Sequence, residues 1–181
     1  MKYYKFLNKN GSTPQGYGAW HSPKGKRPGK WMQKIEGELI LCQNGYHVLR
    51  STDLISWLGP VLWEVEVSGK VIADDNKCVV RRARLIKQVD TWNKETAVQF
   101  AIECAEKVLP IFEKQFPNDK RPRKAIEAAK TGNAAYAEAA AAYAAYAANA
   151  AYAAANAANA AYAAERQWQS AKLIDLLGIP A

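Results

Sequence analysis

Cysteine and histidine, the residues that many metal sites and covalent catalysts use, are scarce in this chain. It contains three cysteines and two histidines in 181 residues, and Cys42, Cys78 and Cys104 stand at spacings that match no metal motif. We therefore expect no metal and no other cofactor, and we expect reduced thiols in a cytosolic protein. Cys42 with His47, on either side of a turn, is one example of a nucleophile with its base, and the pair has the right residue types only. A buried thiol and a structural histidine explain both residues without catalysis.

Long apolar runs are missing as well. Residues 1–7 contain no run of the signal-peptide type, and the uncharged stretch 139–164 contains no Leu, Ile, Val or Phe. We predict a protein that is not inserted in a membrane and that works in the cytoplasm.

Acidic residues are absent from the start of the chain. Residues 1–35 hold eight Lys or Arg and no Asp or Glu, so this segment accounts for the whole net charge of +8. A local positive field favours phosphate-bearing partners. A lysine-rich, solvated surface is an equal alternative.

Residues 133–164 have almost nothing but alanine, interrupted by Tyr, Asn and one Glu. Because alanine is the strongest helix former, this stretch predicts one long helix or several packed ones. The larger side chains recur mostly at every third position, so they would face several neighbours in turn. We expect an alanine-rich helical frame and, because closely packed alanine faces suit symmetric association, a homo-oligomer.

Residues 1–89 have the alternation of β-strands. We predict strands at 2–7, 31–35, 38–41, 46–49, 61–67, 70–73 and 77–89, and a short helix at 53–58 capped by Ser51. From residue 90 the period becomes helical. Thr91 is the expected N-cap, Pro110 is expected to bend or restart the first helix, and further helices open at Arg121 and cover 167–177. The predicted fold is α+β, with a mainly antiparallel β domain (1–89) that includes the short helix, and an alanine-rich helical domain (90–181).

Aromatic and cationic side chains are interleaved in a long loop near the N-terminus. Such a pattern can stack on bases while it pairs with phosphates. Arg82 and Arg84 share one strand face, whereas Arg81 points to the other, and ion pairing with the acids is the favoured alternative for these arginines and for Arg121 and Arg123. The predicted ligand-binding residues are Tyr17, Trp20, His21, Lys24, Lys26, Arg27, Trp31, His47, Arg82 and Arg84.

No glycine-rich phosphate loop is present, since Gly16 and Gly18 do not join a strand to a helix. An enzyme acting on NAD or a nucleotide is a further alternative, with His47 and either Glu64 or Glu66 handling a nicotinamide ribose.

Residues 104–130, from Cys-Ala-Glu-Lys-Val-Leu-Pro to Arg-Pro-Arg-Lys-Ala-Ile-Glu-Ala-Ala, resemble the opening of a helical module found in immunity proteins of bacterial toxin systems and in many phage or prophage proteins. The alanine-rich tract and Trp168-Gln169 fit the same module. The segment around Cys42 to His47 and Trp63 to Glu66 resembles a phage-borne domain often fused ahead of it. The resemblance implies an accessory protein of a mobile element that works in the host cytoplasm if it is phage-encoded.

Three hypotheses follow. The first is a non-enzymatic, anti-defence type protein that sequesters a nucleotide-type immune signal or binds nucleic acid. The second is a protein–protein inhibitor or immunity protein whose helical domain contacts a host or toxin protein. The third is the NAD- or nucleotide-acting enzyme.

Overall fold

The computed structural model describes residues 1–15, 18–131 and 159–181, with side chains in the last range from residue 163 onward. The predicted alanine-rich spine therefore lies outside the described residues except at its end, and Tyr17 lies outside them too. The described chain divides into two compact units. One joins Met1–Asn93 with Leu173–Ala181, and the other is Lys94–Lys172.

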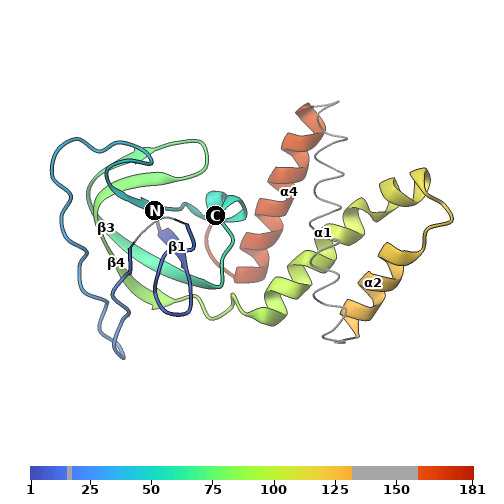
Figure 1. The fold of residues 1–181 in the computed structure, drawn as a ribbon, viewed down its shortest axis with the longest axis horizontal. Helices are drawn as coiled ribbons and strands as arrows, with labels where there is room; N and C mark the ends of the chain where they lie inside the picture. The colour runs from blue at the N-terminus through green and yellow to red at the C-terminus, as the bar shows by residue number, and fades with distance from the viewer. Residues whose placement is uncertain (16–17, 132–158) are drawn as a thin grey trace. The chain divides into compact units, whose positions relative to one another are not determined.

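The first unit is built on an antiparallel sheet, and helices follow it in the chain, so the predicted α+β class is confirmed (Figure 1). Its strands, in the order β1-β3-β4-β2, are β1 (Tyr3–Leu7), β3 (Val61–Ala73), β4 (Cys78–Gln88) and β2 (Tyr46–Val48). Tyr4 and Leu49 also exchange two backbone hydrogen bonds of 2.8 and 2.9 Å. The sheet consequently curls until β1 meets the residue that follows β2.

β3 is one long strand, so the predicted division into separate strands at 61–67 and 70–73 is wrong. The register with β4 shifts between Ser68 and Val71, and Gly69 has a φ of 87°. A glycine that adopts positive φ lets a strand absorb extra residues as a bulge instead of turning away.

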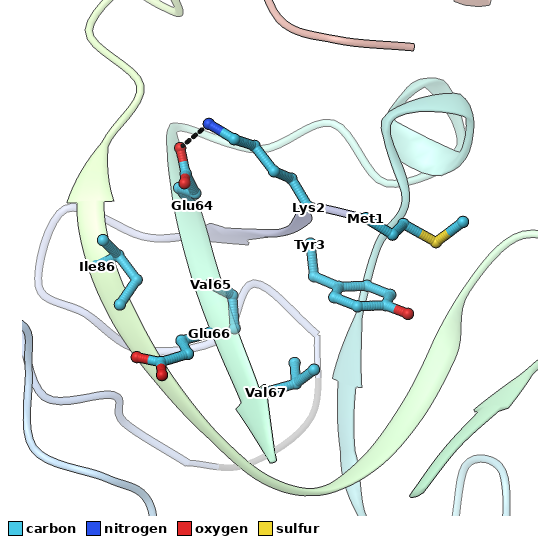
Figure 2. Close-up of a pocket in the computed structure, with 8 residues that line it drawn as sticks. All are labelled: Met1, Lys2, Tyr3, Glu64, Val65, Glu66, Val67 and Ile86. Carbon is cyan, nitrogen blue, oxygen red and sulfur yellow. Dashed lines mark hydrogen bonds and ion pairs between the residues drawn. The ribbon is translucent and has the colours of Figure 1, made fainter. Parts of the chain in front are cut away.

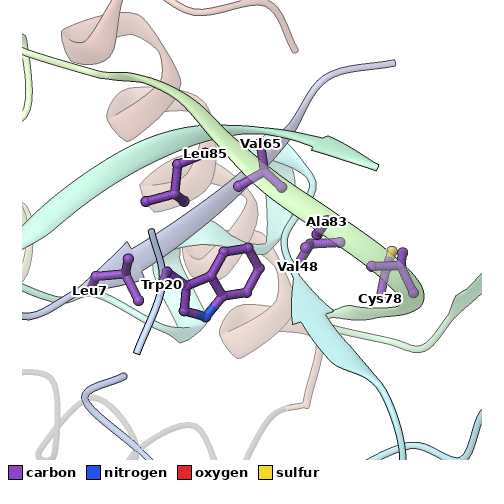
Figure 3. Close-up of a cluster of buried hydrophobic side chains, with 8 residues drawn as sticks. Leu7, Trp20, Val48, Val65, Cys78, Ala83 and Leu85 are labelled. Carbon is purple, nitrogen blue, oxygen red and sulfur yellow. The ribbon is translucent and has the colours of Figure 1, made fainter. Parts of the chain in front are cut away.

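The curled sheet encloses a core of apolar side chains from all four strands and from the N-terminal loop (Figure 3). The Val and Leu side chains of this core contribute roughly 1.5–3 kcal/mol each when they are fully buried. The cluster consists of Leu7, Trp20, Val48, Val65, Cys78, Val80, Ala83 and Leu85.

The predicted strands at 31–35 and 38–41 are wrong, because this segment is irregular. It nevertheless follows one edge of β4: the amides of Gly29, Met32 and Ile35 donate to the carbonyls of Leu85, Ala83 and Arg81 at 2.8, 2.9 and 3.0 Å. Donors at every third residue meet acceptors at every second one. A regular ladder cannot form with that spacing.

The predicted short helix is a 3-10 helix, η1 (Ser51–Ser56). Its N-cap is Arg50, so the predicted cap at Ser51 is wrong. The Asp53 carboxylate accepts hydrogen bonds from the Arg50 amide at 2.9 Å and from its guanidinium at 2.7 Å. The side chain at the third position of η1 thus bonds back to the N-cap amide, as the acidic residue of a capping box does, and fixes the start of η1.

Within the described residues, three helices follow, α1 (Lys94–Gln115), α2 (Arg121–Lys130) and α4 (Asn159–Leu177). The predicted N-cap at Thr91 is wrong, because α1 begins at Lys94 and the Thr91 hydroxyl instead donates to the Leu177 carbonyl at 2.7 Å. α1 runs on through Pro110 without restarting. Its apolar face packs on α2 through Ile102, Ala105, Leu109, Ile126 and Ala129.

Candidate binding surfaces

Part of the basic N-terminal loop is held in place by residues 29–35, which run along one edge of β4. A turn at residues 24–27 is closed by two backbone hydrogen bonds of 3.0 and 3.1 Å between Lys24 and Arg27. Gly29 is buried next, and a Cβ there would lie 2.0 Å from the His21 carbonyl oxygen. Only a glycine allows this close approach, so the four residues 24–27 project from a fixed base.

Trp31 lies against the two arginines that share the outer face of β4. The guanidinium carbons of Arg84 and Arg82 lie 4.6 and 5.0 Å from the centre of its ring. Arg84 also pairs with Glu66 at 2.6 Å, whereas Arg82 is exposed and makes no ion pair within the described part of the chain. Arg81 faces the other way and donates to the carbonyls of Ile35 and Gly37 at 2.6 and 2.8 Å.

The other predicted ligand residues are distributed differently. His21, Lys24, Lys26 and Arg27 are exposed. Among the described residues, no carboxylate pairs with Lys24, Lys26 or Arg27. Trp20 instead lies in the core, 7% exposed, with its ring edge-on to Tyr46 at 5.7 Å. The structure thus brings Trp31, Arg82 and Arg84 together and places Trp20 behind them in the interior.

His47 is held by a backbone amide and not by a thiol. The Cys42 N–H donates to His47 Nε2 at 3.0 Å, so the ring is neutral there and carries its proton on Nδ1. Burial lowers the pKa of His47, and the positive charges of Lys5 and Lys77 lower it further. Cys42, although not a glycine, has a φ of 63°, and this contact and the turn at residues 40–44 hold the backbone there.

The acids predicted for an enzyme are engaged by cations. Glu64 pairs with Lys2 at 3.2 Å and with Lys87 at 3.8 Å, and Glu66 pairs with Arg84. In the described ranges, no group of three or more His, Cys, Asp or Glu residues could hold a metal ion.

A pocket of about 310 Å³ opens beside the start of β1, where β3 continues past its partner strand (Figure 2). The Lys2–Glu64 ion pair lies at one side of it and Tyr3 and Val67 at the other. No predicted ligand residue lines this pocket, whose walls are Met1, Lys2, Tyr3, Glu64, Val65, Glu66, Val67 and Ile86.

Sequence reasoning missed Lys5. It is half-buried on β1, and its Nζ lies 5.8 Å from the centre of the Trp20 ring. Burial lowers the pKa of Lys5 to about 8. The signal available in the sequence was its place between Tyr3 and Leu7, on the strand face that turns toward the core.

The two helices α1 and α2 form a hairpin braced by ion pairs. Lys130 pairs with Glu106 at 2.6 Å, and Arg123 holds both carboxylate oxygens of Glu113 at 2.7 and 2.6 Å. Arg121 pairs with Asp119 at 2.7 Å. Ion pairing, the favoured alternative for the arginines, therefore describes Arg84, Arg121 and Arg123 but not Arg82.

Comparison with known proteins bears on the helical part of the chain. Residues 87–139 match the model of a family described as "Imm-5 like putative immunity protein". The match spans α1 and α2 and covers less than a third of the chain. No curated protein and no solved structure matches the chain. In the part of the chain that the structure describes, no helix is both long and apolar enough to cross a membrane.

Proposed function

We propose that the protein is an immunity-type inhibitor that binds and neutralises a partner toxin protein. The carrying observation is the family match at residues 87–139, which includes the whole α1–α2 hairpin. The predicted origin in a phage or prophage, the cytoplasmic location and the homo-oligomer remain parts of this proposal.

The physical character of the hairpin supports a binding role. Its two helices share a buried apolar cluster, and the ion pairs of Lys130 and Arg123 cross from α2 to α1. A surface that is already ordered loses little conformational entropy when a partner binds, which favours tight association.

The test begins with affinity purification of the tagged full chain from the cell that encodes it. Each recovered protein is then produced in a bacterial test strain, alone and together with this chain. We expect one recovered protein to arrest growth, co-expression to restore growth, and the purified pair to form a complex of fixed stoichiometry. Growth arrest that this chain does not relieve, or the absence of any toxic partner, would contradict the proposal.

A second candidate function is the capture of a nucleotide-type ligand or nucleic acid by the first unit. The observation that favours it is Trp31 with Arg82, an aromatic ring beside an arginine that has no carboxylate partner among the described residues. Lys24, Lys26 and Arg27, which pair with no carboxylate among the described residues, add positive charge nearby in sequence. Base stacking and phosphate pairing need these two kinds of side chain together.

Thermal melting in the presence of ATP, NAD or a short single-stranded oligonucleotide tests this candidate. Binding should raise the melting temperature, rising salt should reduce the effect, and Trp31→Ala and Arg82→Ala should abolish it. Lys9→Ala, which removes an exposed cation elsewhere in the N-terminal segment, is the matched control. Equal shifts in all three variants would mean that the Trp31 surface is not the site.

A further inference from the structure

The end of the α1–α2 hairpin at which the chain turns from α1 into α2 exposes an aromatic pair. The ring centres of Phe112 and Phe116 lie 5.0 Å apart, and the Phe116 amide donates to the Phe112 carbonyl at 2.8 Å. Phe116 is 50% exposed, and the neighbouring Ile111 is 62% exposed. The buried cluster between the helices ends at Leu109, so these side chains lie beyond it.

The backbone that carries the pair is firmly anchored. Asp119 donates its amide to the Phe116 carbonyl at 3.1 Å, and both of its carboxylate oxygens are held by Arg121. Arg123 on α2 holds Glu113, which comes directly after Phe112. The aromatic rings are therefore presented from a fixed turn.

The charge around this aromatic pair is positive. Residues 110–131 contain six Lys or Arg and three Asp or Glu. The acids Glu113 and Asp119 are both taken up by arginines. Lys114, Lys120 and Lys124 make no ion pair with any described residue.

We propose that this end of the hairpin, centred on Phe112 and Phe116 and surrounded by Lys114, Lys120 and Lys124, is the docking surface for an acidic protein that presents an apolar pocket. The inference rests on the proposed function and specifies where the partner binds and what kind of surface it has. A few anchor side chains in well-packed pockets, aromatic ones prominent among them, supply most of the affinity of a typical interface. Lysines that pair with no described carboxylate surround the anchor, and they favour an acidic partner and speed its encounter.

Direct binding measurements test the site. Purified partner, recovered as described above, is titrated with wild type, Phe116→Ser and the double variant Lys120→Glu/Lys124→Glu. We expect each change to weaken binding at least tenfold, and the effect of the charge reversal to shrink at high salt. The control is Leu58→Ser in the first unit, which removes an apolar side chain that is 43% exposed and should leave affinity within twofold. Circular dichroism melting establishes that each variant is folded.

A synthetic acidic peptide with Leu and Trp anchors provides a second arm that needs no partner. Nuclear magnetic resonance of the full chain should show the largest shifts at residues 111–124, and a peptide with every Glu replaced by Lys should produce none. If no toxic partner is recovered, the proposed function fails, and this arm still decides the docking surface.

Three results would overturn the inference. The first is wild-type affinity in Phe116→Ser together with full protection from the toxin, which would leave the function standing and place the contact elsewhere. The second is the absence of peptide shifts near the hairpin end. The third is a wild-type dimer that Phe116→Ser converts to a monomer, since a second copy of the chain would then occupy the surface.

Discussion

Two side chains of the first unit, Lys5 and His47, lie in positions where a positive charge is unfavourable. Lys5 keeps an ammonium group in a half-buried position beside Trp20, and no described carboxylate pairs with it. His47 lies in the same positive field and avoids a charge of its own by accepting the Cys42 amide. Residues of this kind make stability depend on pH and on backbone conformation.

Replacing Lys5 by Met should stabilise the protein at neutral pH. The folded pKa of Lys5 is about 8 against an ordinary value of 10.5, so between these values the unfolded chain binds the proton more tightly. Wild-type stability should therefore rise as pH increases from about 8 to about 10.5, by up to about 3 kcal/mol from this group. Urea unfolding across that range should show this rise in wild type and lose most of it in Lys5→Met. Comparison of the two proteins removes the contributions of other titrating groups, and parallel pH curves would refute the assignment.

Cys42→Gly should also stabilise the protein. A side chain at a φ of 63° costs on the order of 1 kcal/mol that glycine avoids, and part of this gain is lost to the greater freedom of glycine in the unfolded chain. The amide bond to His47 does not involve the side chain and should persist. We expect a gain of about 0.5 kcal/mol in the free energy of unfolding. Cys42→Ala keeps the Cβ and should change stability little. A glycine variant that is no more stable than wild type would contradict the prediction, and a destabilised Cys42→Ala would show that the thiol itself is needed.

Elements were predictable where their own periodicity decided them. The alternation that predicts a strand at 77–89 corresponds to β4, and the helical period after residue 90 corresponds to α1. The segment at 31–35 misled because its amides bond to β4 at every third residue, which makes an edge without a strand. Trp31 and Arg82 could be suggested as partners from residue type, but only the path of this segment along β4 brings them within 5.0 Å.

The element-scale prediction concerns Pro110 in α1. Proline has no N–H to donate to the carbonyl of Glu106, yet the helix continues to Gln115. Because Pro110 is exposed, Pro110→Ala should restore that hydrogen bond and stabilise the helix by roughly 1–3 kcal/mol. Far-UV circular dichroism during urea unfolding measures the gain. Lys114→Ala, an exposed change on the same helix, is the control, and a loss of stability in Pro110→Ala would contradict the prediction.

At the scale of the whole molecule, the sequence pattern predicts the α+β class of the fold. It does not predict that the sheet curls until β1 meets the residue that follows β2. The change of period near residue 90 indicates a sheet followed by helices. Periodicity reports which face of an element is buried but not which neighbour covers it. The residues around Tyr4 and Leu49 give no sequence signal for the bridge between them that curls the sheet. The residues around Leu173 likewise give no signal that the end of the chain joins the first unit. The proposed domain boundary between residues 89 and 90 does not include the return of Leu173–Ala181 to the first unit.

Because Leu173–Ala181 belong to the first unit, we expect a chain that lacks them to be less stable. Leu173 is fully buried and Leu177 is 2% exposed, and the Leu177 carbonyl accepts the hydroxyl of Thr91. Loss of two buried leucines costs about 2–5 kcal/mol each, which is comparable to the whole stability of a small domain. A chain ending at Lys172 should therefore lose the near-UV circular dichroism and the protected tryptophan fluorescence of the sheet unit at a much lower temperature than wild type. A chain ending at Gly178 keeps both leucines and should melt like wild type. If the two shortened chains melt alike, the sheet and its loops fold without the end of α4, and the boundary near residue 90 is sufficient to define the first unit.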